Sequence, residues 1–238
     1  SEELLQASAE LGAPALLLPG ESQRLAEVLS SELPGQDAAQ ILALIGASGG
    51  LGVSCLTVAL STRAADTGLR SAAVELAGCG GGLDLLFGAE TQVGMTWEEL
   101  RHAVGEIGDL TPHLVPAERV SVLALGRPHG DSPDEAALSA VLRSLERSHD
   151  LVVVDAGDGA RLAELGRRVV PLLMVGADVR SVAAARMRAR RIDLTGALLV
   201  VRVGKGRGLP PEAVSDALGL PLAGVVRDDP RVPRLAAQ

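Results

Sequence analysis

One glycine-rich segment reads Ile45-Gly46-Ala47-Ser48-Gly49-Gly50-Leu51-Gly52-Val53-Ser54-Cys55. It follows an apolar run over residues 41–45 and precedes a helical pattern that starts at Val53. Glycine lets a backbone approach a ligand closely, and the first N–H groups of a helix attract phosphate. A plain strand-to-helix turn is the alternative, but four glycines within residues 46–52 favour a phosphate-binding site.

Short apolar runs alternate with helical patterns on the C-terminal side of this segment. The predicted strands are 41–45, 69–76, 120–125, 151–154, 169–175, 197–203 and 222–226. The predicted helices are 53–65, 134–147, 161–168, 180–191 and 211–218. Runs that are apolar at nearly every position suit strands buried on both faces, as in parallel sheets covered by helices. The pattern predicts an α/β fold with a mostly parallel, doubly wound sheet flanked by helices.

The composition excludes several kinds of chemistry. The chain has no tyrosine, and Lys205 is its only lysine, so a mechanism that needs a lysine must use that residue. A net charge of −8 and a pI near 5.1 argue against a nucleic-acid coat protein. Two cysteines, Cys55 and Cys79, fit a reducing compartment. No apolar stretch reaches the roughly 18 residues of a membrane helix, so we expect a cytoplasmic protein without a membrane span.

The glycines fit a dinucleotide-binding turn as one interpretation. Gly46, Gly50 and Gly52 have the spacing of the nucleotide turn in short-chain dehydrogenases, and Glu75 ends the next predicted strand, where an acid can hold a ribose hydroxyl. That family transfers protons with a Tyr-x-x-x-Lys pair, which this chain lacks. A Rossmann-like protein that binds NAD(P) stays open as an alternative.

The same segment also resembles the phosphate loop of MinD/ParA-type ATPases, whose deviant Walker A motif is Lys-Gly-Gly-x-Gly-Lys-Ser/Thr. Residues 48–54 match its glycines and its final hydroxyl, whereas Ser48 and Val53 stand at the two lysine positions. Two further segments keep the family's frame. Residues 74–77 end in Ala77 where a second carboxylate is expected, and residues 151–155 resemble a Walker B strand that ends in Asp155.

Within that family the chain looks like the CpaE/TadZ-like branch, which includes septum-site-determining homologues. The supporting segments are 80–90, 95–100, 176–182 and 217–222. The resemblance implies a P-loop domain over residues 38–238, and residues 1–37 would be a lead-in or the tail of a receiver-like domain. It also implies a localisation or assembly factor for Flp/Tad-type pili or secretion machinery, or for septum placement.

The resemblance assigns roles to individual residues. Those expected to bind nucleotide are Gly49, Gly50, Leu51, Gly52, Val53, Ser54 and Cys55. Ser54 and Asp155 would hold Mg²⁺ when ATP or ADP binds, and Glu75 is the one acidic candidate for a catalytic role. Without the two lysines, we expect nucleotide binding to be weaker by roughly two to four powers of ten. Hydrolysis is expected to be weak or absent, and the alternative is an active ATP-dependent monomer–dimer switch in which arginine replaces lysine.

Partners follow from the same resemblance. We expect a second copy of the chain, in a nucleotide-linked dimer, and proteins of pilus, secretion or division machinery that bring the protein to a pole or septum. DNA contact through Arg180, Arg186, Arg188, Arg190 and Arg191 is the less favoured interpretation of that cluster. A solvated helix face is the favoured one. Arg202 or Lys205 could line a base pocket, although a surface loop fits that region better.

Overall fold

The structure is a computed structural model, and residues 39–78, 82–126, 132–166 and 168–229 are described. The predictions for residues 1–37 lie outside the described residues. The described part contains a single eight-stranded sheet with the strand order β3-β4-β2-β5-β1-β6-β7-β8. Its strands are β1 Gln40–Gly46, β2 Ser71–Glu75, β3 Val115–Ala117, β4 Val120–Leu123, β5 Leu151–Asp155, β6 Val169–Gly176, β7 Leu198–Val203 and β8 Leu222–Arg227.

All strand pairs are parallel except β3 with β4, which confirms the prediction of a mostly parallel sheet. The strand β1 lies between β5 and β6, so the chain winds away from it in both directions. In such sheets, ligands bind outside the carboxyl ends of the strands at the point where the winding reverses. The loop that follows β1 therefore lies where a ligand is expected.

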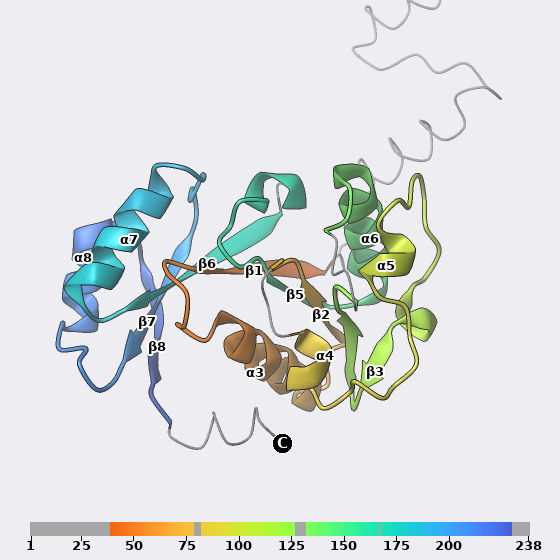
Figure 1. Cartoon of the computed structure of the whole chain (residues 1–238), viewed down its shortest axis with the longest axis horizontal. Coiled ribbons are helices and arrows are strands. Elements are labelled where there is room, and N and C mark those ends of the chain that lie inside the picture. Colours follow the sequence, from red (N-terminus) through yellow and green to blue (C-terminus); the bar gives the residue numbers. More distant parts are fainter. Residues whose placement is uncertain (1–38, 79–81, 127–131, 167, 230–238) are drawn as a thin grey trace, which may run out of the picture. The chain divides into compact units, whose positions relative to one another are not determined.

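Helices cover both faces of the sheet. The helices are α3 Val53–Asp66, α4 Leu83–Leu86, α5 Trp97–Leu100, α6 Glu135–Ser148, α7 Val179–Ala189 and α8 Pro211–Leu218, with short 3-10 turns at Thr111–His113 and Leu162–Leu165. Figure 1 shows α3 and α4 on one side of the sheet and α6 and α7 on the other. No helix among the described residues has the length and apolar character needed to cross a membrane.

The core lies along the central strands, as the apolar runs predict. Ile41 and Leu44 of β1 and Val152, Val153 and Val154 of β5 are each at most 1% exposed. The edge strand β8 instead alternates between half-buried and exposed residues. Burial on both faces is therefore confined to the centre of the sheet, which is where runs of consecutive branched apolar residues occur.

Several parts of the secondary structure differ from the sequence-based expectation, among them the short helices α4 and α5, which were not predicted. The prediction of a helix over 161–168 is wrong. The described residues there form only the 3-10 turn Leu162–Leu165, which ends at Gly166 with φ 92°. The strand β3 was not expected, and it pairs with β4 through a tight turn in which Glu118 has φ 52°. Three residues are too few to give a periodic signal.

Candidate phosphate-binding site

The loop between β1 and α3 has the open geometry that its glycines predict. Gly50 and Gly52 adopt φ of 75° and 89°, in the left-handed region that favours glycine. A Cβ added at Gly49 or Gly50 would meet nothing within 4 Å, so this part of the backbone faces open space. The helix α3 begins directly after Gly52 without a side-chain cap. Its first N–H groups are thus free of intrahelical partners and available to an anion.

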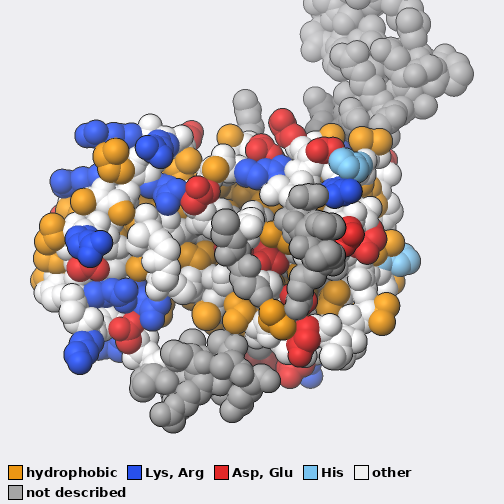
Figure 2. Space-filling view, in the orientation of Figure 1, with side chains coloured by type: hydrophobic (Ala, Val, Ile, Leu, Met, Phe, Trp, Pro, Cys, Tyr) orange, Lys and Arg blue, Asp and Glu red, His pale blue; other side chains and the backbone are white. Residues whose placement is uncertain are grey.

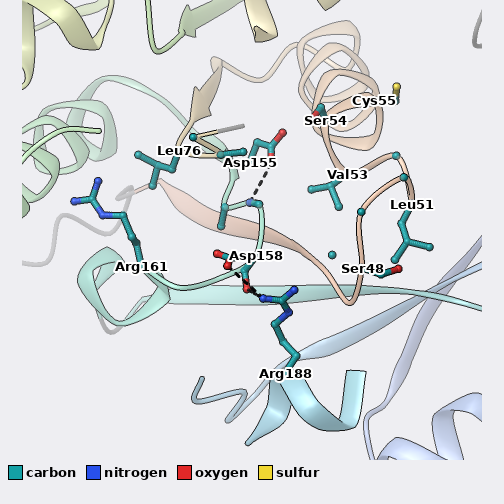
Figure 3. A pocket seen from close by; sticks show the side chains of 18 residues that line it. Ser48, Leu51, Val53, Ser54, Cys55, Leu76, Asp155, Asp158, Arg161 and Arg188 are labelled. Atoms are coloured by element: carbon teal, nitrogen blue, oxygen red, sulfur yellow. Dashed lines mark hydrogen bonds and ion pairs between the residues drawn. The ribbon is translucent and has the colours of Figure 1, made fainter. Parts of the chain in front are cut away.

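A cavity of about 610 Å³ opens in front of this loop. Its walls are the loop itself, the residues that follow β2 and β5, and two arginines, Arg161 and Arg188 (Figure 3). All the residues predicted to bind nucleotide line it, namely Gly49, Gly50, Leu51, Gly52, Val53, Ser54 and Cys55. Asp155 lines it as well. The fold therefore brings the predicted loop and the predicted metal ligands to one cavity.

Asp155 has an unusual environment at the end of β5. It is 1% exposed, its Oδ1 accepts from the Gly157 N–H at 3.1 Å, and its Oδ2 has no hydrogen-bond partner. Burial raises the pKa of Asp155, while the Ser54 hydroxyl and the Gly157 N–H act in the opposite direction. A buried carboxylate oxygen without a partner, next to a hydroxyl, suits a hard cation.

The donor set fits Mg²⁺ shared with a ligand rather than a cage made of protein groups. No cluster of three or more His, Cys, Asp or Glu suited to a metal occurs within the described ranges. Magnesium commonly takes one or two protein ligands and completes its shell with water and phosphate oxygens. Ser54 and Asp155 are sufficient for that arrangement.

The positions of the two missing lysines carry no positive charge. Val53 is half-buried at the start of α3, Ser48 is exposed at the start of the loop, and the only lysine, Lys205, does not line the cavity. Ala77, which stands where the resemblance expects a carboxylate, does line it. The loop thus keeps its shape and lacks the side chains that the resemblance associates with phosphate charge and hydrolysis.

Glu75 lies apart from the cavity. It is 3% exposed, and its Oε2 accepts from the backbone N–H groups of Leu125 at 3.1 Å and Leu83 at 3.3 Å. Burial raises its pKa, the two N–H groups oppose this, and the negative charges of Asp155 and Asp84 add to it. The carboxylate joins β2 to the segment after β4 and to the first residue of α4, and it is not placed to hold a ribose hydroxyl.

This environment gives a pH prediction for Glu75→Gln. The pKa of Glu75 is higher in the folded state than its ordinary value of 4.5. The stability that the protonated carboxyl contributes is therefore fully present below pH 4.5 and is lost as the pH rises through the raised pKa. Denaturant unfolding should show that Glu75→Gln loses less unfolding free energy than the parent as the pH rises from 4.5 through the raised pKa of Glu75. Glu90→Gln, at an exposed position, is the control, and parallel pH curves for parent and Glu75→Gln would contradict the assignment.

Arg202, on β7, holds the loop from outside the cavity. Its Nη1 donates to the carbonyl of Leu51 at 2.6 Å and of Gly50 at 3.3 Å, and its Nε donates to Asp228 at 2.7 Å. Neither Arg202 nor Lys205 lines this cavity, since Lys205 is exposed and Arg202 supports the loop from behind. Sequence reasoning did not identify this supporting role.

A matched pair of glycine substitutions tests the role of this contact. A Cβ at Gly52 would lie 2.9 Å from Arg202 Nη1, whereas one at Gly219, with φ 66°, would meet nothing within 4 Å. Both Gly52→Ala and Gly219→Ala should cost about 1–2 kcal/mol of unfolding free energy because of the left-handed backbone. Gly52→Ala should cost about 1 kcal/mol more, because it displaces the guanidinium. Equal losses in urea unfolding would show that Arg202 contributes nothing to loop stability.

The arginine cluster on and just after α7 divides into two groups. Arg180, Arg186, Arg190 and Arg191 are exposed, as expected for a solvated face. Figure 2 shows basic side chains gathered over the end of the molecule formed by α7 and α8. Arg188 does not belong to this solvated face, because its side chain is only 23% exposed and lines the cavity. Helical spacing alone did not reveal which arginine turns inward.

The chain is similar in sequence to two proteins of known sequence. No protein-family model matches the chain. Two uncharacterised proteins of Mycobacterium tuberculosis strains, Rv3660c and MT3760, are each 33% identical over 217 residues, which is 88% of this chain and 61% of theirs. The chain therefore spans less than two thirds of these relatives.

Solved structures resemble the chain more in fold than in sequence. A chain of the MinC:MinD cell division protein complex of Aquifex aeolicus aligns with a TM-score of 0.69 at 18% identity, over 83% of this chain and 85% of that one. The cell division ATPase MinD of Pyrococcus furiosus gives 0.67 at 20% identity, over 84% and 87%. The septum site-determining protein MinD of Pyrococcus horikoshii, complexed with Mg-ADP, gives 0.63 at 19%, over 83% and 85%. Together with the strand order and the glycine-rich loop, these likenesses show that the described domain has the P-loop fold of the MinD/ParA ATPases.

Proposed function

We propose that this chain is a degenerate MinD/ParA-like nucleotide-binding protein that works as a localisation or assembly factor. It would bind ATP or ADP with Mg²⁺ weakly and hydrolyse ATP slowly or not at all. One observation carries the proposal. The cavity keeps the glycine loop, the uncapped helix start and the unpartnered Asp155 oxygen, while Val53 and Ser48 stand at the lysine positions.

Each part of the cavity has a role in this proposal. The N–H groups of residues 49–55 would hold the phosphates, and Ser54 and Asp155 would hold the metal ion. Mg²⁺, when bound, neutralises phosphate charge. Positioned charge supplies most of phosphoryl-transfer catalysis, and Val53 and Ala77 supply none. Binding without efficient turnover is the expected result.

The cellular role rests on resemblance. The segments 80–90, 95–100, 176–182 and 217–222 are similar to the CpaE/TadZ-like branch, which supports Flp/Tad-type pilus, secretion or septum machinery as the partner. One similar structure is a MinC:MinD complex, which supports a division-type partner. The protein would then reach a pole or septum through its partners. A fluorescent fusion that is evenly dispersed in cells would contradict both settings.

An active ATP-dependent monomer–dimer switch is the second candidate. It is favoured by the two arginines in the cavity wall, since a guanidinium can supply the charge that lysine would. A Rossmann-like NAD(P)-binding protein is disfavoured, because the Glu75 carboxylate is buried against backbone N–H groups.

Calorimetric titration separates these functions. Separate titrations would use Mg-ATP, Mg-ADP and NADPH, with light scattering at saturation and an ATP hydrolysis assay. Weak binding of the magnesium nucleotides, no binding of NADPH and negligible turnover are expected. Tight Mg-ATP binding with dimerisation and turnover would support the active switch instead. Absence of any nucleotide binding at millimolar concentration would contradict nucleotide binding altogether.

A further inference from the structure

The cavity wall contains two guanidinium nitrogens without partners. Nε of Arg188 and Nη1 of Arg161 are buried and make no hydrogen bond. Both side chains line the cavity, along with the unpartnered oxygen of Asp155. A buried N–H group that lacks an acceptor costs about 1–3 kcal/mol, and more when the group is charged. A phosphate oxygen that reached either nitrogen would remove this cost.

The two arginines are held differently. Arg161 makes two hydrogen bonds to Glu164 Oε2, from Nε at 2.9 Å and from Nη2 at 2.6 Å, which neutralise much of its charge. Arg188 donates from Nη1 to the carbonyl of Asp158 at 2.7 Å, and its carboxylate partner, Asp158 Oδ2, is 3.5 Å away. Arg188 thus has one short contact to a neutral oxygen and a looser ion pair, which leaves it the more available cation.

Their directions also differ. In Figure 3 the guanidinium of Arg188 lies beside Asp158 and enters the cavity from the side opposite Ser54, whereas Arg161 lies on the far side from the loop. Under the proposed function, the N–H groups at the start of α3 would hold the inner phosphates, and Ser54 and Asp155 would hold Mg²⁺. Arg188 lines the cavity across from Ser54, so it is the cation available to a phosphate that extends beyond those groups.

We propose that Arg188 binds the terminal phosphate of Mg-ATP in place of the missing lysines, so that the chain distinguishes a triphosphate from a diphosphate. This inference rests on the proposed nucleotide binding at the same cavity. Arginine suits the role because its planar fork donates to phosphate oxygens while another nitrogen keeps its contact with Asp158. A protein without efficient turnover would then still report whether ATP or ADP is bound.

The test compares Mg-ADP with a non-hydrolysable Mg-ATP analogue by calorimetry. The parent should prefer the triphosphate by about tenfold or more, the worth of one charge-assisted hydrogen bond. Arg188→Gln should abolish that preference and leave the Mg-ADP affinity within about twofold, because the diphosphate does not reach the side chain. Arg188→Lys, which keeps the charge, should restore part of the preference.

Three controls separate phosphate binding from structural support. Arg190→Gln removes the same charge from an exposed position beside α7 and should keep the parent preference. Arg161→Gln should reduce the preference less than Arg188→Gln does. Asp158→Ala removes the carboxylate that faces Arg188 in the cavity and should preserve or increase the preference, whereas a merely structural role of Arg188 would make Asp158→Ala resemble Arg188→Gln. Thermal unfolding without ligand verifies that every variant is folded.

The outcomes distinguish this inference from the function on which it rests. If the parent binds both nucleotides equally, or if Arg188→Gln keeps the preference, the assignment of Arg188 is wrong and nucleotide binding stands. If the parent binds neither nucleotide at millimolar concentration, the proposed nucleotide binding fails and the assignment of Arg188 fails with it.

Discussion

Val53→Lys is expected to tighten the binding of Mg-ADP by roughly ten- to a hundredfold, the equivalent of one charge-assisted contact worth about 1.5–3 kcal/mol. Val53 is the first residue of α3 and lines the cavity, so a lysine there can extend over the loop toward the phosphates. Its backbone already has the helical conformation. The substitution therefore adds a charge to a preformed loop rather than building a new site.

The measurement is calorimetric titration of Mg-ADP into the parent and the variant. The matched control is Val93→Lys, which adds the same charge at a valine that is 94% exposed and does not line the cavity. A general effect of added positive charge would tighten binding equally in both variants. If Val53→Lys binds no more tightly than Val93→Lys, then the loop lacks the geometry of a phosphate site.

Trp97→Ala is expected to cause the largest loss of stability, about 3–5 kcal/mol of unfolding free energy. Trp97 is fully buried at the start of α5, and its indole N–H donates to the carbonyl of Glu75 at 2.8 Å. The truncation leaves a large cavity in a core that has few aromatic side chains. It also leaves a buried carbonyl without its donor, beside the carboxylate of the same residue.

Urea unfolding followed by circular dichroism measures this loss. Trp97→Phe keeps much of the volume and should cost less, mainly through the missing hydrogen bond, at about 1–3 kcal/mol. Phe87→Ala is the second comparison, because Phe87 is the only other aromatic residue and is half-buried. A smaller loss for Trp97→Ala than for Phe87→Ala would show that Trp97 does not anchor this part of the core.

Local patterns were sufficient for the framework of the fold. Helix α8 coincides with its predicted range 211–218, and α3 and α6 differ from theirs by one residue at each affected end. The loop of residues 46–52 was recognisable because its left-handed positions need glycine. Residues 161–168 misled the prediction, because apolar residues at helical spacing do not reveal that Gly166 ends the turn. Strand β3 was too short to be detected.

The amino-acid order alone was enough to indicate a parallel α/β sheet, a phosphate-type loop, an acid at the end of β5 and the absence of lysine from that loop. These features depend on residues that are close in the chain. The inward position of Arg188, the support of Leu51 by Arg202 and the burial of Glu75 became apparent only in the folded molecule. Arg202 and Leu51 are 151 positions apart, and Glu75 and Leu125 are 50 apart. Whether a charged side chain faces solvent, a carbonyl or a cavity depends on which strands become neighbours, and that is decided by packing across the whole sheet.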